Sequence, residues 1–176
     1  IMLCLIAATV TAEQRKPVKP LPKDKCPVCG MFVAKYPDFV AEILFKDGSC
    51  AVFDGVKDML KYYFAPEKYN PKKKRSDIDV IYVTDYYGLQ LIDGFQAFYV
   101  IGSDVYGPMG RELIPFSSRS EAEEFRKDHQ GKAVNRVAPI VTPAELGDHR
   151  VRPGRGTVRR TFHHENARQK HPRPPE

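Results

Sequence analysis

The order of predicted elements is the feature that most constrains how this chain folds. The apolar pattern predicts two strands, a helix and a strand, and then the same order again. The expected strands and helices lie at 40–45, 49–53, 56–64, 80–84, 89–92, 97–101, about 120–129 and 133–137. Such an arrangement is typical of an α+β protein, here with two consecutive ββαβ-like units as an internal pseudo-repeat.

Local signals set the boundaries of these elements. Asp47-Gly48 predicts a hairpin turn. Asp54 is expected to cap the first helix, with Met59 on its apolar, core-facing side. Ser120 with Glu123 predicts a capping box at the second helix, and Gly131 is its expected C-cap.

The N-terminal residues read as targeting and linking segments. Residues 1–12 are nearly all apolar or small and too few to span a bilayer, so we interpret them as the end of a truncated signal peptide cleaved after Ala12. Lipid anchoring at Cys4 is the less favoured alternative, because Leu3 is bulky for a lipoprotein box. Residues 13–25 form a Lys/Pro-rich linker. We therefore expect an exported, periplasmic protein.

The C-terminal residues 144–176 are predicted to be a disordered basic tail. The formal net charge of the chain is +6, and residues 147–176 carry eight Lys/Arg against three Asp/Glu. The remainder is nearly neutral, which argues against nucleic-acid binding by the folded part. The tail is a candidate contact to an anionic membrane surface. We expect its His163, His164 and His171 to be solvated rather than ligands.

The segment Cys26-Pro-Val-Cys29-Gly-Met31 carries the clearest chemistry. Thiolate and thioether sulfurs are soft ligands that select Cu(I) over hard cations. Met109 lies between Pro108 and Gly110 in a turn-rich loop, where its sulfur is free to project toward a partner. From the residues alone, a structural disulfide or a thioredoxin-like redox pair remains open for the two cysteines. A structural zinc site is disfavoured, because the folded part has no second ligand pair.

The other reactive side chains favour ordinary structural roles. We expect Cys50, in a strand beside Ala51 and Val52, to be a small buried hydrophobe, and His129 to interact with a helix C-terminus. We find no Ser-His-Asp set and no phosphate-binding glycine loop, so the chain does not read as a hydrolase or nucleotide enzyme. The enzyme alternative is a thiol–disulfide oxidoreductase that uses Cys26 and Cys29. A third alternative is a non-catalytic module with a structural disulfide.

Two stretches resemble the NosL family of copper chaperones that serve nitrous oxide reductase. One is Cys-Pro-Val-Cys-Gly-Met-Phe-Val at 26–33, followed by Phe-Asp-Gly-Val-Lys-Asp-Met at 53–59. The other runs from 102 to 116, followed by a helix end with Ala122, Phe125, His129 and Gly131. The similarity extends from about 24 to 143 and leaves the basic tail outside. It implies a NosL-like domain over 26–143, with units at 26–86 and 87–143.

The resemblance implies an exported Cu(I)-binding metallochaperone rather than an enzyme. The family's candidate copper ligands map to Cys29, Met31 and Met109, with Cys26 as a second thiolate or a protecting neighbour. A copper-receiving enzyme, nitrous oxide reductase or a relative of it, would be the partner. A homodimer is among the expected partners, since the sequence leaves open how many chains share one ion.

Overall fold

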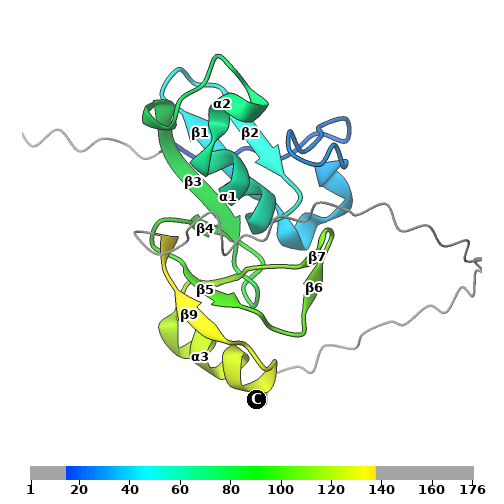
Figure 1. The fold of residues 1–176 in the computed structure, drawn as a ribbon, viewed down its shortest axis with the longest axis vertical. Coiled ribbons are helices and arrows are strands. Elements are labelled where there is room, and N and C mark those ends of the chain that lie inside the picture. Colours follow the sequence, from blue (N-terminus) through cyan, green and yellow to red (C-terminus); the bar gives the residue numbers. More distant parts are fainter. Residues whose placement is uncertain (1–14, 138–176) are drawn as a thin grey trace, which may run out of the picture.

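The computed structural model describes residues 15–137, which form a four-stranded and a three-stranded antiparallel sheet, each with helical segments beside it, and a small two-stranded hairpin (Figure 1). The first sheet has four strands in the order β2-β1-β3-β4. Its elements are β1 (Ala41–Phe45), β2 (Cys50–Phe53), β3 (Ile78–Thr84) and β4 (Leu91–Asp93), with α1 (Val56–Phe64) and α2 (Pro66–Tyr69) between β2 and β3. The 3-10 turns are η1 (Val33–Lys35), η2 (Pro37–Phe39) and η3 (Arg75–Asp77).

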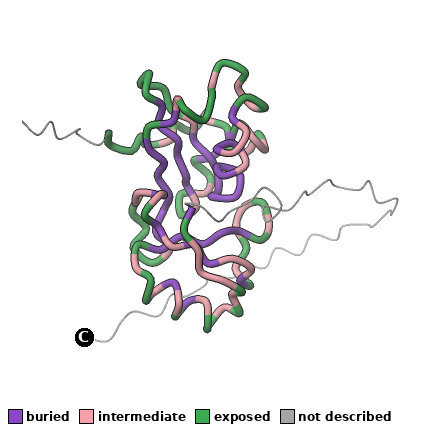
Figure 2. Tube along the Cα trace, turned by 60° about the vertical axis from the view of Figure 1, so that its left-hand side comes forward, coloured by how far each residue is buried: buried purple, intermediate pink, exposed green. Residues whose placement is uncertain are grey.

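The core of the first unit lies between α1 and one face of this sheet. Ile43 of β1 and Phe53 of β2 are fully buried there, and Met59 and Leu60 of α1 pack against them. All five residues of β1 are buried, and the strand lies inside the sheet between β2 and β3. Buried residues, in purple, follow the sheet in Figure 2. The predicted core role of Met59 is confirmed. Burying large apolar side chains contributes roughly 1.5–3 kcal/mol each.

The N-terminal segment covers part of the opposite face of the sheet. Glu42 is buried on β1, and its Oε2 accepts a hydrogen bond from the backbone N–H of Val18 at 2.8 Å. Arg15 donates to the backbone carbonyls of Phe45 at 2.6 Å and Lys46 at 2.8 Å. These bonds connect the segment just before the Cys26 loop to the sheet.

The second sheet has the order β8-β5-β9 and is covered by α3. Its elements are β5 (Phe98–Ile101), β8 (Ile114–Phe116), α3 (Arg119–Asp128) and β9 (Ala133–Asn135). Phe116 and Phe125 form the centre of its core, with ring centroids 5.0 Å apart. Between β5 and β8 the chain forms a small separate hairpin from β6 (Tyr106–Gly107) and β7 (Gly110–Arg111).

The expected α+β class is correct, but several details differ from the prediction. The strand expected at 89–92 to open the second unit is β4, which pairs with β3 in the first sheet, and β8 pairs with β5 in the second. The pseudo-repeat is therefore not confirmed in the predicted form. The reason is that short strands have too little apolar pattern to choose between neighbouring sheets.

The helix ends also differ from the prediction. Helix α3 begins after Ser118, so Ser120 lies inside it and forms no capping box with Glu123. At the other end, Gln130 and not Gly131 has the positive φ, while the Gly131 N–H donates to the Arg126 carbonyl. Gly131 is needed for packing instead, because a Cβ there would lie 2.5 Å from Val100.

Predictions on the chain ends, residues 1–12 with Cys4 and the tail 144–176, lie outside the described residues, and the domain limits stay predictions. None of the helices within 15–137 has the length and apolar character needed to cross a bilayer.

Candidate metal centre

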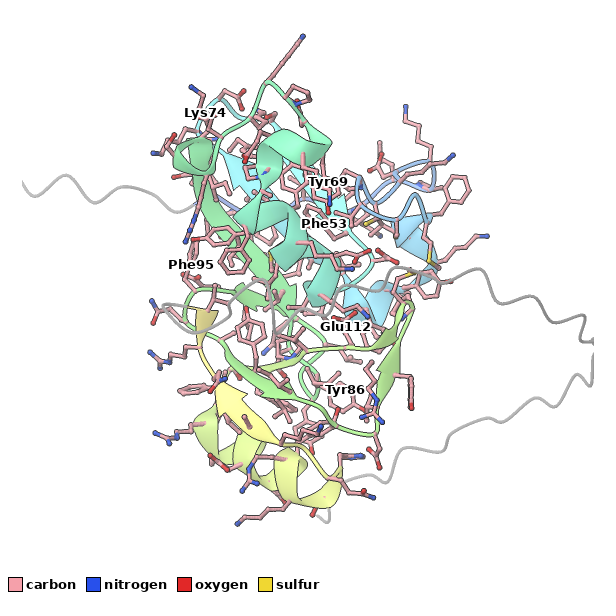
Figure 3. All side chains as sticks on the ribbon, in the orientation of Figure 1. Phe53, Tyr69, Lys74, Tyr86, Phe95 and Glu112 are labelled. Atoms are coloured by element: carbon pink, nitrogen blue, oxygen red, sulfur yellow. The ribbon has the colours of Figure 1, made fainter. Side chains whose placement is uncertain are left out.

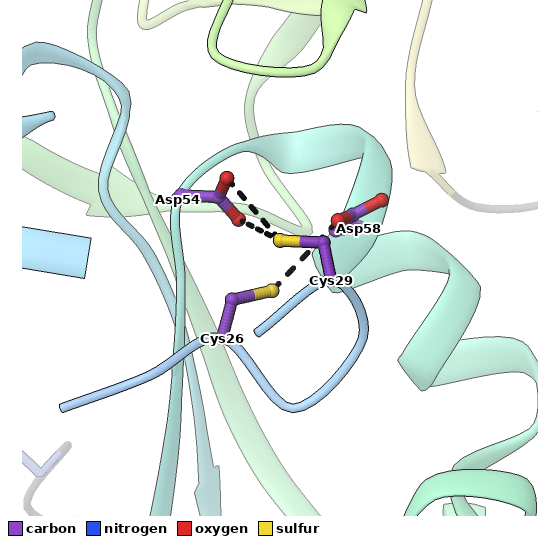
Figure 4. A group of neighbouring side chains, drawn as sticks. All are labelled: Cys26, Cys29, Asp54 and Asp58. Atoms are coloured by element: carbon purple, nitrogen blue, oxygen red, sulfur yellow. Dashed lines mark hydrogen bonds between the residues drawn. The ribbon is translucent and has the colours of Figure 1, made fainter. Parts of the chain in front are cut away.

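The two motif cysteines lie in a short loop that its own backbone closes. The Cys26 N–H donates to the Met31 carbonyl, and the Gly30 N–H donates to the Cys26 carbonyl, each at 2.9 Å. Gly30 has a φ of +80°, a left-handed conformation that glycine adopts without the cost a side chain would add. The loop therefore turns back on itself and directs both thiols to the same side, toward α1 (Figure 4).

Two aspartates from the start of α1 meet these thiols. Asp54 directly follows β2, and Asp58 lies in the first turn of α1, four residues later. Asp54 lies just before the Gly55 cap and Asp58 just after it, and both carboxylates reach the Cys26 loop. Both side chains are buried, at 1% and 2% exposure. Buried carboxylates need polar partners, and the thiols are among them.

The four side chains form one compact cluster. The Cys29 Sγ donates to Asp54 Oδ1 at 3.2 Å and Oδ2 at 3.4 Å, and the Cys26 Sγ donates to Asp58 Oδ2 at 3.8 Å (Figure 4). One ligand atom from each residue lies within 4.8 Å of all the others. Within residues 15–137, no other group of three or more Cys, His, Asp or Glu side chains is placed to hold a metal ion.

The electrostatics of the cluster keep both thiols protonated. Burial, reinforced by the nearby Asp54 carboxylate, raises the pKa of Cys26 to about 11. Burial and Asp54 also raise the pKa of Cys29 above its ordinary range. The described cysteines Cys26, Cys29 and Cys50 are all free thiols. A cation that entered here would reverse this balance, because it favours the deprotonated form of every ligand around it.

The predicted methionines come from the end of the Cys26 loop and from the β6–β7 hairpin. Met31 directly ends the Cys26 loop and is partly exposed. Met109 lies between the paired glycines of the β6–β7 hairpin, and 43% of its surface is exposed. Its backbone carbonyl accepts a hydrogen bond from Lys57 Nζ at 2.7 Å, and Lys57 is the neighbour of Asp58 on α1. The structure thus brings Cys26 and Cys29 together and holds the Met109 hairpin against the same helix turn.

The sequence analysis did not predict the two aspartates of the cluster, and it predicted the wrong exposure for Cys50, which lies outside the cluster. Asp54 was expected to cap α1, but the cap position is Gly55 and the Asp54 carboxylate faces Cys29. The spacing of Asp54 and Asp58 was the available signal. Cys50 was expected to be buried, but it is exposed, because it begins the edge strand β2.

The fold and the site together define a class, a small α+β protein with a buried thiol–carboxylate cluster suited to a metal ion. Comparison with known proteins then identifies the family. The family model NosL matches residues 17–142, so the chain belongs to the NosL family.

Individual relatives give the same family. The chain is 34% identical over 149 residues to the "Copper-binding lipoprotein NosL" of Achromobacter cycloclastes, covering 72% of this chain and 74% of that protein. It is 28% identical over 130 residues to the protein of the same name from Stutzerimonas stutzeri, covering 69% and 65%. The crystal structure of the copper chaperone NosL from Shewanella denitrificans matches with a TM-score of 0.62 at 23% identity. That match covers 76% of this chain and 99% of the other, and it shows a shared fold.

Proposed function

We propose that this chain is a copper-binding chaperone that takes up Cu(I) at the Cys26 loop. The observation that carries the proposal is the cluster itself, in which two free thiols lie beside two buried carboxylates. Soft sulfur ligands select Cu(I), and the anionic carboxylates offset its charge without competing strongly for a soft ion. The names of the relatives, which describe copper binding and a chaperone rather than catalysis, support this reading.

In the proposed site Cys29 binds as thiolate, and Met31 and Met109 add thioether sulfur. Cys26 is a second thiolate or a protecting neighbour. Cys26 is 1% exposed while Cys29 is only partly buried, which favours Cys29 as the first thiol that an incoming ion meets. Two or three soft ligands leave a coordination position open. A ligand from a partner can then enter and take the ion by exchange, whereas a closed four-ligand site would hold it.

The oxidoreductase alternative is disfavoured by the thiol environment. A redox pair attacks as thiolate, and its thiol pKa is lowered by a helix N-terminus or a cation. Here burial and Asp54 raise the pKa values of both cysteines. The structural-disulfide alternative is disfavoured because Cys29 and Cys26 donate to different carboxylates.

An anaerobic Cu(I) titration of the reduced protein against a competing chelator tests the proposal. We expect one ion per chain or per pair of chains, and loss of tight binding in Cys29→Ser. Cys50→Ser is the matched control, since it removes an exposed thiol that lies outside the cluster. Unchanged affinity in Cys29→Ser would refute the site, and activity in an insulin-reduction assay would favour the oxidoreductase.

The finer features of the function extend this proposal. The ion is delivered to a copper-receiving enzyme, for which nitrous oxide reductase is the family's implied acceptor. The protein works after export, in the periplasm, where the basic tail contacts a membrane surface and two chains form a homodimer. Both curated relatives are named lipoproteins, which keeps lipid anchoring as the alternative to simple export. Copper transfer to apo nitrous oxide reductase, followed by its copper absorption bands, tests the acceptor.

A further inference from the structure

Two buried charged side chains link α1 to the hairpin that carries Met109. Lys57 and Glu112 are each only 4% exposed. The Lys57 ammonium group donates to the backbone carbonyls of Met109 and Arg111, both at 2.7 Å. Lys57 therefore binds the chain on both sides of the Gly110 turn position and fixes the backbone of Met109 relative to α1.

Glu112 makes the reverse connection from the hairpin to the helix. Its Oε1 accepts hydrogen bonds from the backbone N–H groups of Lys57 at 2.6 Å and Leu113 at 3.0 Å. The carboxylate thus lies at the N-terminus of α1, where the helix dipole favours a negative charge (Figure 3). It also lies directly over Gly55, because a Cβ on Gly55 would be 2.4 Å from Glu112 Oε2.

The hairpin is a small element that forms its own two-stranded sheet. β6 and β7 pair through two residue pairs only and belong to neither of the larger sheets. A two-stranded hairpin of this size is not stable by itself in water. Met109 is 43% exposed and contributes little to the core. Burying an ammonium group and a carboxylate is costly, and apolar replacements often stabilise a fold at least as well. A role in fixing one orientation explains the two charges better than a role in stability.

We propose that Lys57 and Glu112 form a reciprocal clamp that fixes the Met109 backbone against the first turn of α1, the turn that also carries Asp58 of the thiol–carboxylate cluster. The inference rests on the proposed function, in which Met109 is a copper ligand. Lys57 and Asp58 are consecutive residues of the first turn of α1, and Asp54 directly precedes the Gly55 cap of that helix. Lys57 and Glu112 are thus positioning residues, which touch the backbone around the ligand and not the ion.

Lys57→Leu tests the clamp, since leucine keeps apolar bulk and adds no sulfur. We expect the Cu(I) dissociation constant to rise about tenfold, which corresponds to ~1.4 kcal/mol. In a Met109→Ala background the same substitution should change the affinity little, because its effect acts through Met109. Lys46→Leu is the matched control, since it removes an ammonium bond of 2.7 Å to the Ser76 carbonyl and should leave the affinity unchanged.

Two further measurements separate positioning from simple loss of folding. Glu112→Gln keeps an oxygen that can accept the Lys57 N–H and should retain most of the affinity, whereas Glu112→Leu should lose it like Lys57→Leu. In the copper-free protein, the methyl NMR signal of Met109 should shift toward its solvent-averaged position in Lys57→Leu, while the Met59 methyl signal of the core stays unchanged.

The outcomes are distinguishable. A loss of affinity in Lys57→Leu that disappears in the Met109→Ala background supports the clamp. Two results would overturn the clamp and leave copper binding intact. In one, Lys57→Leu weakens binding equally in the natural chain and in the Met109→Ala background. In the other, Met109→Ala weakens binding but Lys57→Leu does not. If Met109→Ala binds Cu(I) like the natural chain, the clamp has no ligand to position and the proposal fails. Absence of Cu(I) binding in the natural chain would instead refute the proposed function.

Discussion

Copper binding should release one proton for each cysteine that binds the ion as thiolate. Burial raises the pKa of Cys26 to about 11 and also raises that of Cys29, so both thiols hold their protons at neutral pH. A Cu(I)–thiolate bond forms only after the proton has left. The displaced protons then go to the solvent.

The magnitude follows from linkage. Each proton released makes the apparent binding constant rise about tenfold per pH unit, equivalent to ~1.4 kcal/mol. If Cys26 and Cys29 both bind as thiolates, the affinity should rise about a hundredfold per unit between roughly pH 6 and pH 8. The affinity should rise with pH because the thiol pKa values are raised: at lower pH the thiols are protonated and the ion dissociates.

Anaerobic competition titrations over this pH range measure the slope, with a chelator whose own proton dependence is known. Proton release in weakly buffered solution, followed with an indicator dye, gives an independent count. Cys26→Ser should lower the count from two to one if Cys26 is a ligand, and should leave it at one if Cys26 only protects Cys29. A count near zero in the natural chain would refute the reasoning, since it would mean that the thiols are already ionised or are not ligands.

Three other predictions follow from the same contacts. Burial raises the pKa of Glu112 to about 7 in the folded state, above its value of about 4.5 in the unfolded chain. Between these two values the folded protein holds a proton that the unfolded chain has lost. Folding stability should therefore fall as pH rises from about 4.5 to 7, by up to ~3 kcal/mol, and Glu112→Gln should flatten this dependence in urea unfolding curves. Gly55→Ala should destabilise the fold by roughly 1–3 kcal/mol, because its Cβ would meet the Glu112 carboxylate at 2.4 Å; an unchanged melting temperature would contradict this. A thiol reagent should label the exposed Cys50 quickly and the buried Cys26 only after unfolding, as mass spectrometry of timed samples would show.

The structure shows why the sequence predicted some elements well. Helix α1 has the predicted limits, Val56–Phe64, because its apolar residues recur at helical spacing and Met59 and Leu60 face the core. β1 and β2 lie within one residue of the expected ranges, since the Asp47-Gly48 turn sets their register. Both signals are local, so a single sequence carries them.

Other features depended on contacts between distant residues. The three residues of β4 pair with β3 rather than with the second sheet, and their own pattern holds too little information to decide this. Cys50 is exposed because β2 is an edge strand, and strand order is a property of the whole sheet. The Lys57–Glu112 clamp joins residues 55 positions apart, and a local sequence pattern cannot predict such a contact.

The sequence by itself determined which soft donor atoms this protein has available for a metal ion. Cys26, Cys29, Met31 and Met109 are soft donors whatever the fold, and the spacing of the Cys26 loop brings two thiols close together. Only the tertiary structure decided what surrounds them. It buries two carboxylates against the thiols and thereby keeps the protons on sulfur, because desolvation and nearby charge act through space and not along the chain.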